Sequence, residues 1–270
     1  MPARPFWEAP KMLEAIAPLL ALTQASLVGL ILVFTRVAGV VALLPALGEQ
    51  SIPVRFRMAI AIAFTMIIWP IIGAGANAQA AALGDFAPLI LSESFVGLLI
   101  GLSVRMVLIA LQFAGSIASQ SASLTQMMGA GATPDPMPAI GNILVLGGLV
   151  LALSAGLHVK AASAIVSSYQ VVPMGAIPDG TDIANWGVAK ASAVAKIAFT
   201  LSAPFLIASL AYNLMLGFIN RAMPQLMVAF IGAPAITAGG IFLLFLSAPA
   251  LLVAWHVHLD EALLNPFGMP

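Results

Sequence analysis

Long apolar segments recur along this chain, and they restrict its possible folds more than any other feature. Six runs rich in Leu, Ile, Val and Ala reach or approach the roughly 20 residues that a helix needs to cross a bilayer. They cover residues 16–47, 58–72, 86–111, 140–157, 197–218 and 228–255. The alternation typical of membrane β-barrel strands is not visible. The sequence therefore predicts an all-α membrane protein with long, partly broken apolar helices.

The composition leaves too little charge to coat a surface exposed to water. Only 7% of the 270 residues are charged and 61% are hydrophobic, whereas soluble domains carry about 25% charged residues. Lipid, other subunits or both must therefore cover the apolar surface that too few charged residues leave exposed. The ten basic and ten acidic residues cancel, which gives no support for a nucleic-acid partner. The absence of cysteine excludes disulfides, thiolate metal sites and thiol nucleophiles.

Two of the predicted helices are longer than the hydrocarbon core, which is about 30 Å thick. At a rise of 1.5 Å per residue, residues 16–47 would form a helix of about 48 Å, and residues 182–220 one of about 58 Å. Thr181, which follows a Pro-Asp-Gly turn, is the predicted N-cap of the second helix.

The basic residues give an inconsistent orientation. Arg55 and Arg57 place the loop after the first apolar run in the cytoplasm, because basic loops stay on that side. Counting spans onward then places Lys160, Lys190 and Lys196 on the opposite side. We therefore expect that some of these helices do not cross lipid in the ordinary way.

Four charged residues lie within or at the edge of apolar runs: Arg36, Glu93, Arg105 and Arg221. Each would cost roughly 2.5–3.5 kcal/mol at the centre of a membrane helix, so none should face lipid there. Glu93 and Arg105 cannot pair with each other, because they lie about 18 Å apart along one helix. An ion or proton pathway is one interpretation. The other is that they pair across helices or subunits or extend to the membrane interface, and pairing is the interpretation we favour.

Gly97 and Gly101 form a small-xxx-small pair within residues 86–111. Such pairs allow two helix backbones to approach closely. The pair therefore predicts a tightly packed neighbouring helix.

No catalytic or metal-binding motif is present. His256 and His258 precede Asp260 and Glu261, but residues two apart do not share a helix face. P-loop, GxSxG and HExxH motifs are absent, so a phosphate cradle, a nucleophile and a Lewis acid are missing. We expect neither an enzyme nor a cofactor.

The segment between residues 112 and 139 is small, polar and glycine-rich, and it has no basic residue. Three prolines near its end prevent a continuing helix. Met127 and Met128 stand beside Gly129 and Gly131. Because thioether side chains repack around different shapes, the segment fits a flexible closure over a conduit. An ordinary surface loop has the same composition, so both interpretations remain open.

A series of short motifs relates residues 33–245 to a known family by their order and spacing. They are Arg36-Val-Ala-Gly39, Pro45, Ile52-Pro53-Val-Arg55, Glu93, Gly97, Gly101, Phe113-Ala-Gly115, Gln120, Asp135-Pro136, Gly156-x-His158, Ser168-Tyr169 and Pro173. The most specific are Asn213-Leu-Met-Leu-Gly217, Asn220-Arg221-Ala-Met-Pro224-Gln225 and Gly232-x-Pro234. Through these motifs the sequence resembles the FliR family, the R component of the flagellar type III export gate. The T component is its injectisome counterpart.

The resemblance implies a structural and gating subunit in the bacterial inner membrane, within the export apparatus of the flagellar basal body. Family members assemble with the P and Q components into a closed helical gate through which unfolded flagellar subunits pass, and the B component is a further neighbour. By analogy, residues 1–185 would form a P-like helical part, and residues 186–270 a Q-like helical hairpin that turns near residues 221–230. Neighbouring subunits hold the long helices of this family, which would explain the failed orientation count.

The resemblance also implies roles for particular residues. A loop that plugs the closed channel corresponds to residues 116–138. Its candidate residues are Gln120, Met127, Met128, Gly129, Gly131, Pro134, Asp135 and Pro136. The candidates for helix packing and subunit contacts are Arg36, Glu93, Gly97, Gly101, Asn213, Gly217, Asn220, Arg221, Pro224 and Gln225.

Two alternatives differ from a flagellar gate subunit. The chain could be the T component of a virulence injectisome, which neighbouring genes would distinguish. It could also be a small-molecule secondary transporter, a class that favours inverted repeats and an acidic coupling site near the midplane. Only Glu93 offers such a carboxylate, and no repeat is visible. A transporter should purify alone or as a homo-oligomer, and a gate subunit with other proteins.

Overall fold

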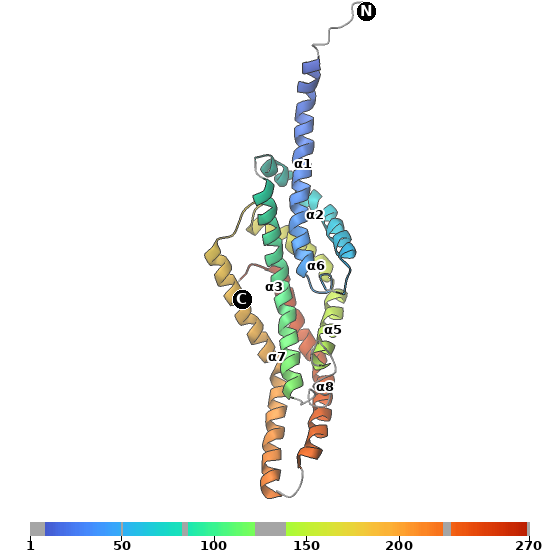
Figure 1. Ribbon diagram of the computed structural model, residues 1–270, viewed down its shortest axis with the longest axis vertical. Helices are drawn as coiled ribbons and strands as arrows, with labels where there is room; N and C mark the ends of the chain where they lie inside the picture. The colour runs from blue at the N-terminus through green and yellow to red at the C-terminus, as the bar shows by residue number, and fades with distance from the viewer. Residues whose placement is uncertain (1–8, 50, 83–85, 122–138, 224–227, 269–270) are drawn as a thin grey trace, which may run out of the picture. The chain divides into compact units, whose positions relative to one another are not determined.

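The structure, a computed structural model, describes residues 9–49, 51–82, 86–121, 139–223 and 228–268. Within these ranges every regular element is a helix (Figure 1). The helices are α1 (Ala9–Leu43), α2 (Val54–Ala82), α3 (Phe86–Ser121), α5 (Ala139–Ser154), α6 (Leu157–Val171), α7 (Gly180–Ala222) and α8 (Val228–Leu264). The predicted all-α class is confirmed.

Five of the described helices, α1, α2, α3, α7 and α8, contain stretches long and apolar enough to cross a membrane. A sixth candidate is the pair formed by α5 and α6, which meet at a bend of 71°. Gly156 lies at this bend with φ of +80°, a conformation that side chains other than glycine rarely adopt. The chain is therefore a multi-pass membrane protein.

The long helices predicted from the sequence are continuous. The first, α1, ends at Leu43, two residues before Pro45. The 43 residues of α7 correspond to about 65 Å, twice the thickness of the hydrocarbon core.

The predicted N-cap of α7 is wrong. The cap is Asp179, with extended backbone angles (φ −62°, ψ 143°), and its carboxylate accepts a hydrogen bond of 3.0 Å from the backbone N–H of Thr181. A carboxylate at this position satisfies a backbone donor that the first turn leaves open, and it also interacts favourably with the helix dipole. The hydrogen bonds from Thr181 lower the pKa of Asp179 below its ordinary value of 3.8.

The described helices belong to two compact units. The first comprises Met1–Gly101 and Ala162–Pro178, and so contains α1, α2 and the first part of α3. Buried side chains recur along α1 at Val33, Val37 and Val40, the spacing of one helix face. In α2, by contrast, only 17% of the apolar span is buried.

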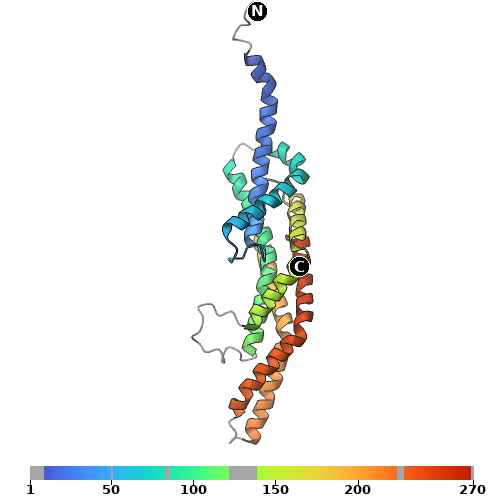
Figure 2. The same ribbon diagram turned by 90° about the vertical axis from the view of Figure 1, so that its right-hand side faces the viewer.

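The second unit comprises Leu102–Ala161 and Asp179–Pro270. Here α7 and α8 pack side by side as a hairpin, and α5 packs against α8 (Figure 2). Trp255 of α8 is fully buried, and its indole N–H donates a 2.8 Å hydrogen bond to the carbonyl of Val107 in α3. This bond satisfies the polar atom of the largest buried side chain of the unit.

Candidate functional site

Arg36 and Glu93, two of the charged residues singled out from the sequence, pair with each other inside the first unit. Both side chains are completely buried. Arg36 Nε lies 2.7 Å from Glu93 Oε2, and Arg36 Nη2 lies 3.0 Å from Glu93 Oε1. This is the bidentate geometry in which a guanidinium binds a carboxylate most strongly. The pair joins α1 to α3.

The remaining N–H groups of Arg36 bind the C-terminal end of α6. Nη1 donates to the hydroxyl of Ser168 and to the carbonyl of Val172, and Nη2 donates to the same carbonyl, each at 3.1 Å. All five guanidinium donors therefore have acceptors. A cation at this position also interacts favourably with the negative end of the helix dipole.

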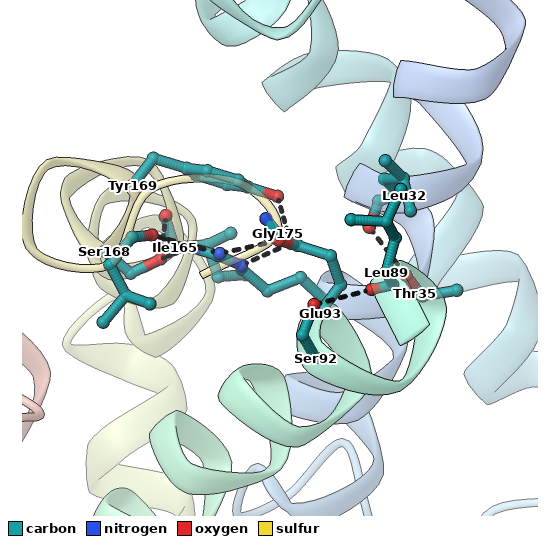
Figure 3. A network of polar contacts seen from close by, with 11 residues as sticks. Leu32, Thr35, Leu89, Ser92, Glu93, Ile165, Ser168, Tyr169 and Gly175 are labelled. Carbon is teal, nitrogen blue, oxygen red and sulfur yellow. Dashed lines mark hydrogen bonds and ion pairs between the residues drawn. The ribbon is translucent and has the colours of Figure 1, made fainter. Parts of the chain in front are cut away.

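Tyr169 of α6 and Gly175, in the segment that follows α6, also contact the carboxylate of Glu93 (Figure 3). The backbone N–H of Gly175 donates to Glu93 Oε1 at 2.8 Å, and the hydroxyl of Tyr169 lies 3.5 Å from Oε2. The Tyr169 ring stacks on Arg36, with 3.7 Å between the ring centroid and Cζ. Gly175 has φ of +78°, which favours glycine at this turn.

The network as a whole is neutral, closed and saturated with hydrogen bonds. A buried charge is tolerated when it is paired and its other donors and acceptors are satisfied. The geometry therefore fits a clamp that fixes α1, α3 and the end of α6 together. An ion or proton pathway would need groups with open hydrogen-bonding capacity, and Arg36 has none left.

Glycines bring α1 and α3 close together next to this network. A Cβ atom on Gly97 would collide with the backbone carbonyl of Arg36. One on Gly101 would lie 2.9 Å from the carbonyl of Val40, and one on Gly39 would lie 2.8 Å from that of Ser94. The small residues on both helices thus allow the backbones to touch, and this proximity allows the short carboxylate of Glu93 to reach Arg36.

The other charged residues from the sequence lie elsewhere. Arg105 is half-buried in α3, in the second unit. Arg221 is exposed in the last turn of α7, where a cation favours the helix dipole. Neither belongs to the clamp.

The predicted contact residues at the end of α7 are exposed. Asn213 donates hydrogen bonds within its own helix, to the carbonyl and the hydroxyl of Ser209. Gly217 has open space where a Cβ would stand, and Asn220 is also exposed. Pro224 and Gln225 lie outside the described residues. A role of these residues in subunit contacts stays a prediction.

The segment predicted to plug the channel is described only at its beginning. Because α3 continues to Ser121, residues 116–121 are helical, and Gln120 is exposed there. Met127, Met128, Gly129, Gly131, Pro134, Asp135 and Pro136 lie outside the described residues. The helices on either side of the segment are in contact, since a Cβ on Gly115 of α3 would collide with Gly141 of α5.

Sequence reasoning did not assign roles to several residues that the structure brings together. Ser168 and Tyr169 were noted only as family motifs, and Gly175 was not noted. An ion pair of 2.6 Å between Lys160 Nζ and Asp260 Oδ1 was also missed. A separation of 100 positions leaves no local signal that could have shown it.

Large apolar side chains remain exposed along the α7–α8 hairpin. The most exposed include Ile207 (68%) and Phe218 (73%) in α7, and Phe242 (68%) and Phe245 (81%) in α8. So many large apolar side chains exposed on one hairpin indicate contact with lipid or with another protein. Fold and composition together thus define a multi-pass, all-α membrane protein with a buried ionic clamp.

Comparison with known proteins identifies the family. The model of the family described as bacterial export proteins, family 1, matches residues 27–262, and the chain belongs to this family.

Relatives named flagellar biosynthetic protein FliR are similar over most of their length. The protein of Caulobacter vibrioides is 29% identical over 233 residues, which cover 86% of this chain and 93% of the relative. The protein of Escherichia coli is 27% identical over 237 residues, which cover 85% of this chain and 87% of the relative. The protein of Bacillus subtilis is 27% identical over 228 residues, which cover 83% of this chain and 87% of the relative. The resemblance drawn from the motifs is confirmed, and the chain is a membrane component of flagellar type III export.

Proposed function

We propose that this chain is a structural and gating subunit of the flagellar type III export gate, and that it has no catalytic activity. In this proposal it forms the export channel with the P and Q components and contacts the B component in the bacterial inner membrane. Unfolded flagellar subunits are the cargo. Its P-like part is residues 1–185, and its Q-like hairpin is residues 186–270.

The apolar surface of the hairpin is the observation that best supports this function. Only 28% of the apolar span in α7 and 22% of that in α8 is buried within the chain. Since α7 is about twice as long as the hydrocarbon core is thick, lipid cannot cover all of it. Neighbouring subunits with apolar helices of their own would cover the remainder.

Purification of the tagged chain from native membranes tests this proposal. We expect the chain to elute together with the P and Q components, which mass spectrometry of the eluted bands would identify. A chain that elutes alone or as a homo-oligomer would refute the proposal and would favour a transporter.

We further propose that residues 116–138 occlude the channel until a substrate displaces them. The resemblance supports this role, and so does the contact between α3 and α5, which holds the two ends of the segment near each other. Shortening the segment should make cells leaky to small solutes, and a dye-entry assay would measure this. Unchanged permeability in a strain whose gate is fully assembled would refute the occlusion.

A further inference from the structure

A cavity of about 540 Å³ lies within the second unit, between α3, α7 and α8. Its walls are largely apolar, with Val107 from α3, Val194 and Ile197 from α7, and Ala262 from α8. The volume is in the range of cavities that bind small molecules. The clamp of the first unit shares no residue with this cavity.

Two lysines of α7, Lys190 and Lys196, line this apolar cavity. Lys190 is half-buried and Lys196 is exposed. Neither forms a salt bridge or a hydrogen bond with another described residue, although the carboxylate of Glu261 acts electrostatically on Lys190. Glu261 and His258 also line the cavity, and the carboxylate of Glu261 lies 3.2 Å from the His258 ring, so the lining carries two lysines against one carboxylate. Lys160, by contrast, is paired with Asp260. The cavity therefore holds more positive than negative charge.

The position of these lysines along α7 matches the headgroup level of a bilayer. Lys196 and Arg221 enclose a stretch of α7 without any charged residue, and they lie about 38 Å apart at 1.5 Å per residue. A hydrocarbon core of about 30 Å fits between them. Because charged side chains avoid the hydrocarbon, Lys196 would lie at one headgroup level and Arg221 near the other, with Lys190 about 9 Å farther from the hydrocarbon than Lys196.

We propose that this cavity binds an anionic phospholipid. The phosphate lies between Lys190 and Lys196, the glycerol part contacts Val194 and Val107, and an acyl chain leaves the cavity past Ile197 toward the uncharged stretch of α7. Basic pockets between membrane helices bind acidic headgroups in this way. An acidic side chain of a partner subunit could satisfy the lysines but would leave the apolar wall unfilled, so the lipid fits the whole cavity better.

The test measures the lipid that stays bound to the full-length chain, purified with whatever subunits accompany it. The protein is exchanged into nanodiscs of equal parts phosphatidylglycerol and phosphatidylcholine, and native mass spectrometry then counts the retained lipids. We expect preferential retention of phosphatidylglycerol. Lys190→Gln and Lys196→Gln should each lower it roughly fivefold, the contribution of one basic residue near an acidic membrane surface.

Two control variants separate this site from general electrostatics and from misfolding. Lys190→Arg keeps the charge and should retain the lipid as the unmodified protein does. Arg55→Gln removes an exposed charge from the first unit and should also leave retention unchanged. Lys196 is exposed, so its replacement should not disturb folding, and Lys196→Gln alone is sufficient for the test.

Three results would overturn the proposal. The first is equal retention of the two lipids by the unmodified protein. The second is a loss in Arg55→Gln as large as that in the lysine variants. The third is unchanged lipid retention together with the loss of a partner subunit, which would assign the lysines to a protein carboxylate. The lipid readout does not depend on the identity of the subunits, so it can succeed or fail separately from the proposed gate function.

Discussion

Arg36 lies in an apolar helix, and its guanidinium is completely buried. Every N–H group of the guanidinium nevertheless has a hydrogen-bond acceptor. One carboxylate and one hydroxyl supply three of the acceptors, and the carbonyl of Val172 supplies the other two. Satisfying the donors with a backbone carbonyl ties the arginine to the end of a helix. The clamp therefore depends on the fold around it as much as on Glu93.

Removing one charge of the clamp should destabilise the protein strongly. Glu93→Gln leaves the buried guanidinium without its counter-charge, and breaking such a pair typically costs about 3–5 kcal/mol. Thermal unfolding of the purified protein in detergent, followed by tryptophan fluorescence, would measure the loss. Asp182→Asn, at an exposed position in the first turn of α7, is the control and should change the midpoint little.

The double variant Arg36→Met/Glu93→Gln provides a sharper test of the pair. It should be less destabilised than the sum of the two single variants, because the second change removes the charge that the first leaves unpaired. Strict additivity would show that the two side chains do not act as a pair.

Gly97 should tolerate no side chain. Gly97→Ala places a methyl group against the carbonyl of Arg36, and such overpacking costs about 1–3 kcal/mol. Gly187→Ala is the matched control, since it lies within α7 with open space around it. It should raise stability slightly, by up to about 1 kcal/mol, because alanine favours the helix. The same unfolding assay compares the two, and equal shifts would contradict the close contact.

For single residues, the sequence indicated which charged side chains need a partner but not which groups form their contacts. Arg36 and Glu93 were notable because charge is expensive in an apolar helix. Their pairing across 57 positions was one of several possibilities. The contributions of Val172 and Gly175 could not be predicted, because they come from backbone groups whose direction only the fold determines.

Helices were easier to predict than their ends. Long apolar runs predicted every described helix except α6, because that signal is summed over many residues, whereas residues 158–171 are not among the runs. Their limits depend on single hydrogen bonds. At α7 the sequence predicted Thr181 as the cap, but Asp179 takes the position because its carboxylate accepts a hydrogen bond from the backbone N–H of Thr181. The extension of α3 to Ser121 was missed for a related reason, since small polar residues resemble a loop in composition.

Asp179 should stabilise the start of α7 in a way that depends on pH. Its pKa is lowered in the folded protein, so its contribution is complete above the unfolded value and is lost as the pH falls below it. Asp179→Ala should therefore speed amide hydrogen exchange in the first turn of α7 at neutral pH. The difference should shrink as the pH falls below 3.8, the ordinary value of this carboxyl.

Asp179→Asn is the control for this effect. Asparagine also caps helices but carries no charge, so the exchange of its first turn should not depend on the ionisation of residue 179. Exchange in Asp179→Ala equal to that of the unmodified protein at neutral pH would exclude the cap.

On the scale of the whole molecule, the exposed apolar surface connects fold and function. Side chains such as Phe245 are exposed because no other helix in the described part of the chain covers them, and this fits a subunit of a larger membrane assembly. Composition anticipated this surface, since 7% charge cannot coat a soluble protein. The partners that cover it could not be predicted from composition, because apolar surfaces carry little directional information.

Two aspartate substitutions would map which part of the exposed apolar surface is covered by lipid or by another subunit. Phe245→Asp and Leu264→Asp each replace a side chain that is 81% exposed. Phe245 lies inside the long apolar run of α8, whereas Leu264 follows the charged Asp260 and Glu261. Phe245→Asp should reduce the yield of assembled membrane complex, because an acidic residue in such a stretch costs about 2.5–3.5 kcal/mol. Leu264→Asp should have little effect, and equal yields would contradict this difference.

The clamp also imposes an order on biosynthesis. Arg36 leaves the ribosome 57 residues before Glu93, a delay of roughly 3–11 s at 5–20 residues per second. Val172 lies 136 residues after Arg36, so the carbonyl that accepts the last two hydrogen bonds of the guanidinium is synthesised later than Glu93. Throughout that interval the nascent first helix carries an uncompensated positive charge. The insertion machinery must therefore shelter this helix from the lipid interior until the later segments arrive.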